Sequence, residues 1–184
     1  MCAISILINL GFDIEQISTL VSQLKPISGR AEIVKIQKNY TIMIDYAHTP
    51  DGLQNILSSL RETTAGRIIL VFGCGGDRDK SKRAQMGKIA GEYANYVVVT
   101  SDNPRTENPL LIINDILYGM EKTKARIAVI ENRHQAIEFA LKKAKKGDVV
   151  LLAGKGHEKY QIVGENKIPF DEKEIIYEYF GRKK

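Results

Sequence analysis

The chain has 184 residues, of which 43% are hydrophobic and 27% are charged. These values fit one globular domain, or one domain plus a fragment of another, and they exclude collagen-like and disordered proteins. Lys and Arg number 27 against 22 Asp and Glu, and because the resulting charge of +5 is mild and scattered, we expect no nucleic-acid partner.

Membrane and secreted proteins are also disfavoured. No apolar run approaches the ~20 residues that a membrane span needs, so we expect no membrane partner. The opening segment lacks the basic start and the small-residue cleavage site of a secretion signal. Cys2 and Cys74 are too few for a disulfide framework. We therefore expect a cytoplasmic protein in which Cys74 is a small buried thiol rather than a nucleophile.

The first thirty residues differ from the rest. Residues 3–10 are apolar but follow no helix-start signal, as though a helix began upstream. Gly11 stops this segment, and Asp13 can cap a second amphipathic helix. The apolar residues of that helix recur at helical spacing: Ile14, Ile17, Leu20, Val21 and Leu24. Because two short helices bury little apolar surface, we expect this segment to pack on something that the chain lacks.

From residue 31 onward, strand-like and helix-like segments alternate. We expect strands at 32–36, 41–46, 67–72, 96–100, 126–130 and 148–153, and helices at 50–61, 83–93, 109–120 and 133–145. Two helix starts place proline after a capping residue, Thr49 before Pro50 and Asn108 before Pro109. The runs IILVF and VVLLA are apolar throughout, which is typical of parallel strands covered on both faces.

The end of the chain adds smaller elements. Residues 160–163 and 167–169 flank a Gly-Glu-Asn turn and predict a small antiparallel edge hairpin. Asp171, with Glu174 three residues later, predicts the start of a last helix. The whole pattern predicts an α/β fold with a doubly wound, mostly parallel, Rossmann-like sheet and helices on both faces. Ligands of such sheets bind beyond the carboxyl ends of the strands.

Four loops follow directly after predicted strands, at residues 45–51, 73–80, 101–107 and 154–158. Each is dense in glycine or in charged and hydrogen-bonding side chains. Because the carboxyl ends of parallel strands meet at one edge of the sheet, we expect the four loops to converge on a single binding site.

The glycine-rich loop at 73–80 allows two interpretations. Gly73, Gly75 and Gly76 permit close backbone approach, so the loop could cradle an anion, or it could be a purely structural turn. No Walker A sequence occurs, and Arg78 stands where a dinucleotide fingerprint needs its third glycine. Arg78 could grip a carboxylate, or the charged run around it could be a solvated helix start.

The loop at 101–107 contains Asp102-Asn103-Pro104-Arg105. Pro104 restricts Asn103 to an extended conformation, which helps to fix the direction of Arg105. An arginine held in this way can clasp a carboxylate or phosphate with two hydrogen bonds. An Asx-type turn with an exposed arginine is the alternative.

The loop at 154–158 places two glycines, His157 and Glu158 after the last central strand. A lone histidine is more often structural than catalytic, and Glu158 could cap a backbone amide instead of binding a ligand. The three histidines have no paired spacing, so we expect no protein-built metal site.

Together these loops resemble the Mur ligases, the ATP-dependent amide-forming enzymes of peptidoglycan precursor synthesis. DYAHTPDGL, FGCGGDRDKSKR, VVVTSDNPRTENP and VVLLAGKGHEKYQIV look like the C-terminal domain of the branch that adds meso-diaminopimelate, in order and spacing. PISGRAEIV looks like the junction that closes the family's central domain. The resemblance implies that residues 1–30 are the tail of a truncated central ATP-binding domain, and that residues 31–184 are the C-terminal, amino-acid-binding domain.

The resemblance also implies a reaction and a set of binding residues. In the family, ATP phosphorylates a carboxylate of a UDP-N-acetylmuramoyl dipeptide, and an incoming amine then attacks the acyl phosphate. Asp45 and His48 match positions that face the nucleotide. The positions that hold meso-diaminopimelate match Arg78, Asp102, Asn103, Pro104, Arg105, Gly154 and Glu158. We expect no catalytic residue within this chain.

Arg105 is the expected specificity determinant. Meso-diaminopimelate carries an ammonium and a carboxylate at its far end, where lysine has only an ammonium. A fixed arginine would bind that carboxylate through charge-assisted hydrogen bonds, whereas with lysine it would be desolvated without a partner. Branches of the family that add lysine usually lack this arginine, so the resemblance favours diaminopimelate.

The family's P-loop, Mg²⁺ ligands and carbamylated lysine lie in the central domain, and no GxxxxGK[ST] sequence occurs here. We therefore expect ATP and Mg²⁺ to bind mainly to the missing central domain, and we expect the chain alone to be inactive. The UDP-binding N-terminal domain is missing as well. The alternatives are a stand-alone amino-acid or nucleotide binding module and a lysine-adding relative. The broken glycine fingerprint disfavours an NAD-dependent oxidoreductase.

Overall fold

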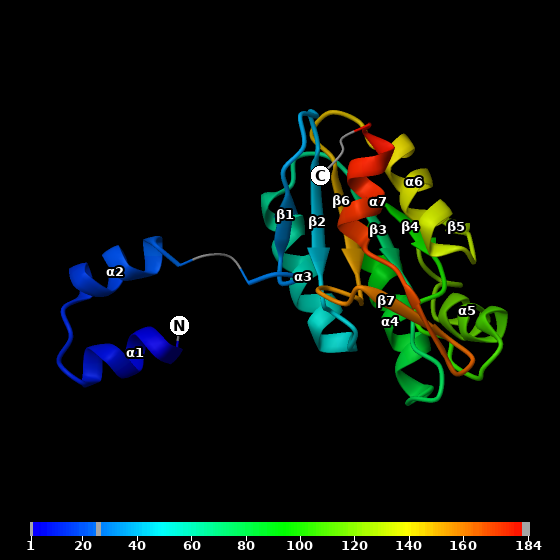
Figure 1. The fold of residues 1–184 in the computed structure, drawn as a ribbon, viewed down its shortest axis with the longest axis horizontal. Helices are drawn as coiled ribbons and strands as arrows, with labels where there is room; N and C mark the ends of the chain where they lie inside the picture. Colours follow the sequence, from blue (N-terminus) through cyan, green and yellow to red (C-terminus); the bar gives the residue numbers. More distant parts are fainter. Residues whose placement is uncertain (1, 25–26, 182–184) are drawn as a thin grey trace.

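The computed structural model describes residues 2–24 and 27–181 of the chain. Its centre is a six-stranded sheet in the order β1-β2-β6-β3-β4-β5, shown as a ribbon in Figure 1. The strands are β1 (Glu32–Val34), β2 (Thr41–Asp45), β3 (Ile68–Phe72), β4 (Tyr96–Val99), β5 (Arg126–Val129) and β6 (Val149–Ala153). β1 pairs antiparallel with β2, and all other neighbours in this sheet are parallel. The mostly parallel α/β fold is confirmed.

Helices cover both faces of this sheet. One face carries α3 (Pro50–Thr63), α4 (Ser81–Tyr93) and α5 (Pro109–Tyr118), and the other carries α6 (Arg133–Lys143) and α7 (Glu172–Tyr179). Because β3 and β6 lie between the two helix layers, every residue of both strands is buried. Their uninterrupted apolar sequences follow from this position.

The predicted helix starts are confirmed by their hydrogen bonds. Thr49 accepts from the backbone N–H of Gly52, and Asn108 accepts from that of Leu110. Asp171 accepts from two backbone N–H groups of α7. Predicted and observed boundaries in the sheet domain differ by one or two residues. The helix after β5, for example, ends at Lys143 rather than at residue 145.

The predicted hairpin is present as β7 (Tyr160–Val163) and β8 (Asn166–Pro169), which form a separate two-stranded sheet. It reaches the loop after β4 through a backbone bridge between Arg105 and Val163. The hairpin therefore lies against the carboxyl ends of the main strands.

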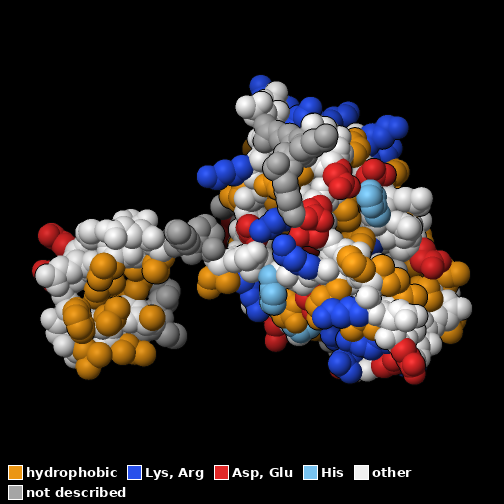
Figure 2. All heavy atoms as spheres, in the orientation of Figure 1, with side chains coloured by type: hydrophobic (Ala, Val, Ile, Leu, Met, Phe, Trp, Pro, Cys, Tyr) orange, Lys and Arg blue, Asp and Glu red, His pale blue; other side chains and the backbone are white. Residues whose placement is uncertain are grey.

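The N-terminal segment forms α1 (Cys2–Asn9) and α2 (Ile14–Ser22), and Asp13 caps α2 as predicted. Figures 1 and 2 show these two helices apart from the sheet, with apolar side chains on their surface. The most exposed of these side chains include Ile6, Leu10, Ile14, Leu20 and Leu24. Leu24, predicted as a helical position, lies beyond the end of α2. Such apolar exposure agrees with the expectation that this segment packs on a surface outside the chain.

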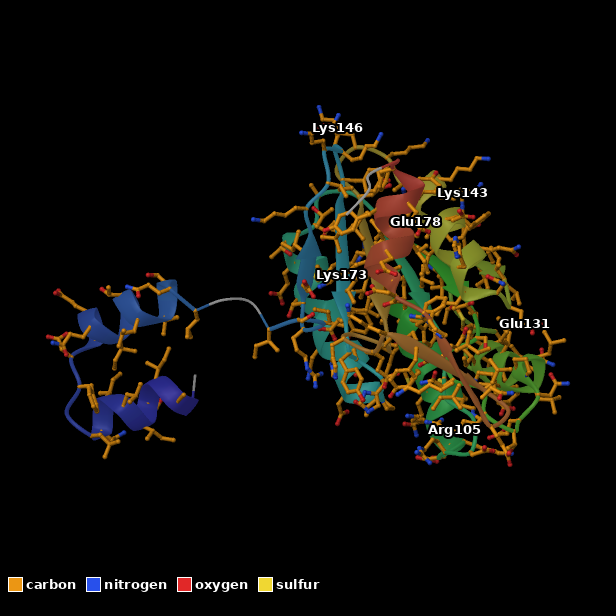
Figure 3. The ribbon with its side chains drawn as sticks, viewed as in Figure 1. Arg105, Glu131, Lys143, Lys146, Lys173 and Glu178 are labelled. Carbon is orange, nitrogen blue, oxygen red and sulfur yellow. The ribbon has the colours of Figure 1, made fainter. Side chains whose placement is uncertain are left out.

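Two lysines of the basic run lie far from Arg105. Figure 3 shows Lys143 and Lys146 at the end of the sheet opposite to Arg105.

Among the described residues, no helix is long and apolar enough to cross a membrane.

Candidate functional site

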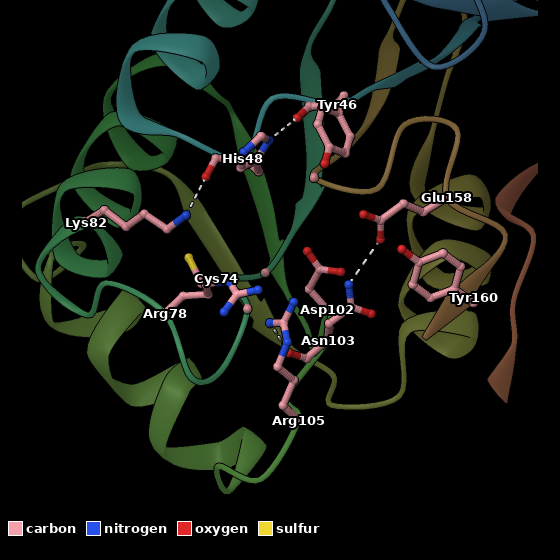
Figure 4. A pocket seen from close by; sticks show the side chains of 13 residues that line it. Tyr46, His48, Cys74, Arg78, Lys82, Asp102, Asn103, Arg105, Glu158 and Tyr160 are labelled. Atoms are coloured by element: carbon pink, nitrogen blue, oxygen red, sulfur yellow. Dashed lines mark hydrogen bonds between the residues drawn. The ribbon is translucent and has the colours of Figure 1, made fainter. Parts of the chain in front are cut away.

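A cavity of about 400 Å³ opens at the carboxyl ends of the parallel strands. All four predicted loops line it, as the close-up in Figure 4 shows. The lining residues are Tyr46, His48, Gly73, Cys74, Gly75, Arg78, Lys82, Asp102, Asn103, Arg105, Gly154, Glu158 and Tyr160. The predicted convergence of the loops after β2, β3, β4 and β6 is thereby confirmed.

The glycines after β3 bring two of these loops into contact. A Cβ atom on Gly73 would overlap the carbonyl oxygen of Thr100, and one on Gly76 would overlap that of Pro104. The backbone N–H of Gly76 donates to the carbonyl of Asn103 at 2.9 Å. Close backbone packing accounts for these two glycines, while anion binding by the loop stays a prediction.

An ion-pair cluster around the buried Arg83 fixes the same two loops. Arg83 on α4, only 1% exposed, donates to Glu107 at 2.8 Å and to Asp115 at 2.9 Å. Glu107 also accepts from the backbone N–H of Asp77 at 2.6 Å. These hydrogen bonds, with the Arg83 bond foremost, lower the pKa of Glu107 to about 2. The charged run after the glycines is therefore only partly a solvated helix start, because Arg83 lies inside the domain.

Arg105 is held by its own backbone and by the glycine loop. Its φ of 52° is unusual for a residue with a side chain, and its N–H donates to the carbonyl of Ile162 in the hairpin at 3.1 Å. Nη1 donates to the carbonyl of Gly76 at 2.7 Å. Within the described part of the chain, Nε and Nη2 have no hydrogen-bond partner, so a ligand carboxylate can take both.

Arg78 and Arg105 form the basic side of the cavity. Figure 4 shows their guanidinium groups directed toward each other from different loops. Arg78 is exposed and donates only to the carbonyl of Asp77, at 3.1 Å, so its side chain is less constrained than that of Arg105. Pro104 is buried and is absent from the lining of the cavity, so its substrate contact stays a prediction.

Asp102, Asn103 and Glu158 form the acidic side. The Asn103 amide nitrogen donates to Glu158 Oε2 at 3.1 Å, and the Asn103 oxygen accepts from the backbone N–H of Ile162. Asp102 and Asn103 are both 7% exposed. Behind them lies Lys155, which contacts all three side chains. Reasoning from the sequence did not single out Lys155, although a lysine two residues after a wholly apolar strand is a usable signal.

The two predicted nucleotide-facing residues, Asp45 and His48, differ in their position relative to the cavity. Both carboxylate oxygens of Asp45 accept backbone N–H groups, from Ala47 and Ala31, each at 2.7 Å, and Asp45 does not line the cavity. His48 does line it, and its Nδ1 donates to the carbonyl of Tyr46 at 2.8 Å. Because a carbonyl can only accept, Nδ1 carries a proton, and in the neutral ring Nε2 is then an acceptor.

Aromatic and cationic groups surround Tyr46 on this side. The His48 and His157 rings lie 4.5 and 5.4 Å from the Tyr46 ring, and the Arg30 guanidinium lies 4.6 Å from it. Lys82 donates to the carbonyl of His48 at 2.8 Å. His157 thus has a packing role, as its lone occurrence suggested.

Two further expectations concern reactive side chains. Cys74 is buried, and this burial raises its pKa to about 12, which agrees with the predicted inert thiol. Residues 2–24 and 27–181 contain no group of three or more His, Cys, Asp or Glu side chains that could hold a metal ion.

Comparison with known proteins gives consistent matches. The profile of a family described as "Mur ligase, glutamate ligase domain" matches residues 29–156. A protein of Caldanaerobacter subterraneus subsp. tengcongensis, named UDP-N-acetylmuramoyl-L-alanyl-D-glutamate--2,6-diaminopimelate ligase, is 51% identical over 178 residues, or 97% of this chain and 37% of that protein. This chain therefore spans little more than a third of that curated relative's length.

Solved structures agree on the fold. A structure titled as a UDP-N-acetylmuramoyl-L-alanyl-D-glutamate--2,6-diaminopimelate ligase superposes with a TM-score of 0.79 at 37% identity, over 97% of this chain and 37% of its own. A folylpolyglutamate synthase/dihydrofolate synthase from Yersinia pestis, solved with AMPPNP and Mn ion, has a TM-score of 0.58 at 17% identity. That match covers 72% of this chain and 29% of the synthase, and it shows the fold alone.

Proposed function

Since the chain belongs to the Mur ligase family, we propose that it is the amino-acid-binding part of a ligase that adds meso-diaminopimelate to UDP-N-acetylmuramoyl-L-alanyl-D-glutamate. Residues 31–184 would form this domain, and residues 1–30 would belong to the ATP-binding domain before it. The complete protein would act in the cytoplasm, where the precursors of the cell wall are made.

The cavity's two-sided charge is the observation that carries this proposal. Arg78 and Arg105 present guanidinium groups on one side, and Asp102 and Glu158 present carboxylates on the other. The far end of meso-diaminopimelate carries one carboxylate and one ammonium. The arginines suit the first, and the carboxylates suit the second.

Positioning of the attacking amine is the chemical role that we assign to this chain. ATP would transfer its γ-phosphoryl group to the dipeptide carboxylate, and ADP would leave. The amine of bound diaminopimelate would then attack the acyl phosphate, phosphate would leave and the nitrogen would lose a proton. A ligand held at its far end by Arg105 and Glu158 presents its other amine in a fixed direction, which lowers the entropic barrier.

The ATP and metal requirements fall mainly outside this chain. His48 and the face of Tyr46 are the groups we assign to the nucleotide side, and Asp45 would act there by holding residue 31 and the loop after β2. We assign the Mg²⁺ site to the rest of the ligase, as the family resemblance implies.

The proposal is tested with a chimera in which this chain replaces the matching 178 residues of the Caldanaerobacter protein. The chimera should form the amide with meso-diaminopimelate and, much more slowly, with lysine. Arg105→Ala should lower kcat/KM for diaminopimelate by about 10- to 150-fold, which corresponds to ~1.5–3 kcal/mol for hydrogen bonds to a charged group. Arg126→Ala on β5, an exposed arginine outside the cavity, is the matched control and should have no effect.

Two results would contradict the proposal. One is an active chimera that uses lysine at a rate similar to that for diaminopimelate, which would favour a lysine-adding relative. The other is full activity of the Arg105→Ala chimera. Ligase turnover by the 184-residue chain alone would overturn the assignment of ATP chemistry to the missing domains.

A further inference from the structure

Lys155 lies fully buried behind the acidic side of the cavity. It lies two residues after the end of β6, between Gly154 and Gly156, and its side chain is 0% exposed. It does not line the cavity. A ligand in the cavity therefore cannot reach this ammonium, and any effect of Lys155 on binding must pass through the residues it contacts.

The Lys155 ammonium has three N–H donors and three acceptors. Nζ donates to Asp102 Oδ1 at 3.1 Å, to Asn103 Oδ1 at 3.0 Å and to Glu158 Oε2 at 3.5 Å. The Tyr160 ring of the hairpin lies 5.9 Å from the same atom. A buried ammonium is stable only when it is paired and fully hydrogen-bonded, and this arrangement meets both conditions.

These bonds select which carboxylate oxygen faces the cavity. Glu158 Oε2 accepts from both Lys155 and the Asn103 amide nitrogen. In the described part of the structure, Oε1 of Glu158 has no hydrogen-bond partner, so it is the oxygen available to a ligand ammonium. In the same way, Lys155 occupies Asp102 Oδ1 and leaves Oδ2, which lies near Gly154.

Lys155 also sets the charge of this side. Asp102 and Glu158 are two carboxylates that converge on one ammonium of the protein. Without that ammonium the two carboxylates would repel each other across the Asn103 amide and would turn toward solvent. With it, the three groups carry a net charge of −1, which suits a single ligand ammonium.

We propose that Lys155 is a positioning residue for the amino acid: it holds Asp102, Asn103 and Glu158 in the one arrangement that receives the distal ammonium. This inference rests on the proposed function for the identity of the ligand. The arrangement of the three side chains, however, can be measured without any ligand.

The test compares Lys155→Met with Lys159→Met in the 184-residue chain. Lys159 lies four residues later, is exposed and pairs with Asp171 instead, so it controls for loss of a lysine from this segment. Meso-diaminopimelate affinity is measured by calorimetry, and the Asn103 side-chain amide is followed by NMR without ligand. Lys155→Met should weaken binding by about tenfold or more and should shift the Asn103 signals. Lys159→Met should do neither.

The same substitution made in a Glu158→Gln chain separates positioning from a general structural role. If Lys155 acts through Glu158, then Lys155→Met should cost much less affinity in a Glu158→Gln chain than in the natural one. The double variant keeps the cluster's net charge at −1, so it serves for the comparison with Glu158→Gln even where Lys155→Met alone does not fold. A loss as large in the Glu158→Gln chain as in the natural chain would show that Glu158 takes no part in the effect and would overturn the proposal.

The remaining outcomes are also decisive. A folded Lys155→Met chain with unchanged affinity and unmoved Asn103 signals would overturn the positioning role. If the natural chain binds no diaminopimelate, its ligand assignment fails, while the Asn103 signals still decide whether Lys155 holds this cluster.

Discussion

Replacing Arg83 with methionine should loosen the two loops that carry Arg78 and Arg105. Arg83 is 1% exposed, whereas the side chains of its partners Glu107 and Asp115 are 17% and 48% exposed. Removing one partner of a fully buried ion pair costs about 3–5 kcal/mol. Because both carboxylates here can turn to water, we expect a loss of about 2–3 kcal/mol, which lowers Tm by roughly 4–12 °C for a chain of this size.

The pH dependence of stability gives a sharper signature. The pKa of Glu107 is lowered from 4.5 to about 2 in the folded protein. Its stabilisation is therefore complete above pH 4.5 and is lost as the pH falls through 2. This lowering of the pKa corresponds to about 3 kcal/mol at most, and we take roughly half because the carboxylate keeps some contact with water. Between pH 6 and pH 3 the natural chain should lose about 1 kcal/mol through this group.

Urea unfolding at pH 6 and pH 3 measures both effects. Arg83→Met should be less stable at pH 6 and should lose less stability on acidification, since only Lys80 and the Asp77 N–H still stabilise the Glu107 carboxylate. Lys88→Met, an exposed change on the same helix, is the control. Equal stability of Arg83→Met and the natural chain at pH 6, or an equal loss on acidification, would refute the reasoning.

Two further predictions concern the same loops. Gly76→Ala should destabilise the chain by roughly 1–3 kcal/mol in urea unfolding, because the new methyl group would overlap the Pro104 carbonyl. Gly52→Ala on α3 is the milder comparison, since its methyl group would meet a side-chain atom, the Thr49 hydroxyl, at 3.1 Å; equal stability of the two variants would contradict this. The Cys74 thiol, with its pKa raised to about 12 by burial, should resist iodoacetamide at pH 8 in the folded chain and react in urea; rapid labelling of the folded chain would show that it is accessible.

The sequence predicted the fold well because its strongest signals are local. Thr49 and Asn108, each followed by proline, specify helix starts whatever the tertiary context. The runs around β3 and β6 are apolar because both strands are covered on two faces. The order of strands in the sheet depends on contacts between distant segments. The convergence of the four loops could still be predicted, because it requires only that the strands run parallel.

The parts of the site that sequence reasoning missed depend on contacts between distant segments. Arg83 stood in a charged run typical of a solvated surface, and only its pairing with Glu107 and Asp115 explains its burial. Asp45 is predicted to face the nucleotide, and only the folded chain reveals that both of its carboxylate oxygens also accept backbone N–H groups. Lys155 was overlooked because two of its partners, Asp102 and Asn103, lie more than fifty residues before it in the sequence.

The most direct test of the account is a crystal structure of the chimera with meso-diaminopimelate bound. We predict that the distal carboxylate accepts hydrogen bonds from Nε and Nη2 of Arg105, while the distal ammonium donates to Glu158 Oε1. A complex in which the diacid binds elsewhere and the Arg105 side chain points into bulk water would contradict the account.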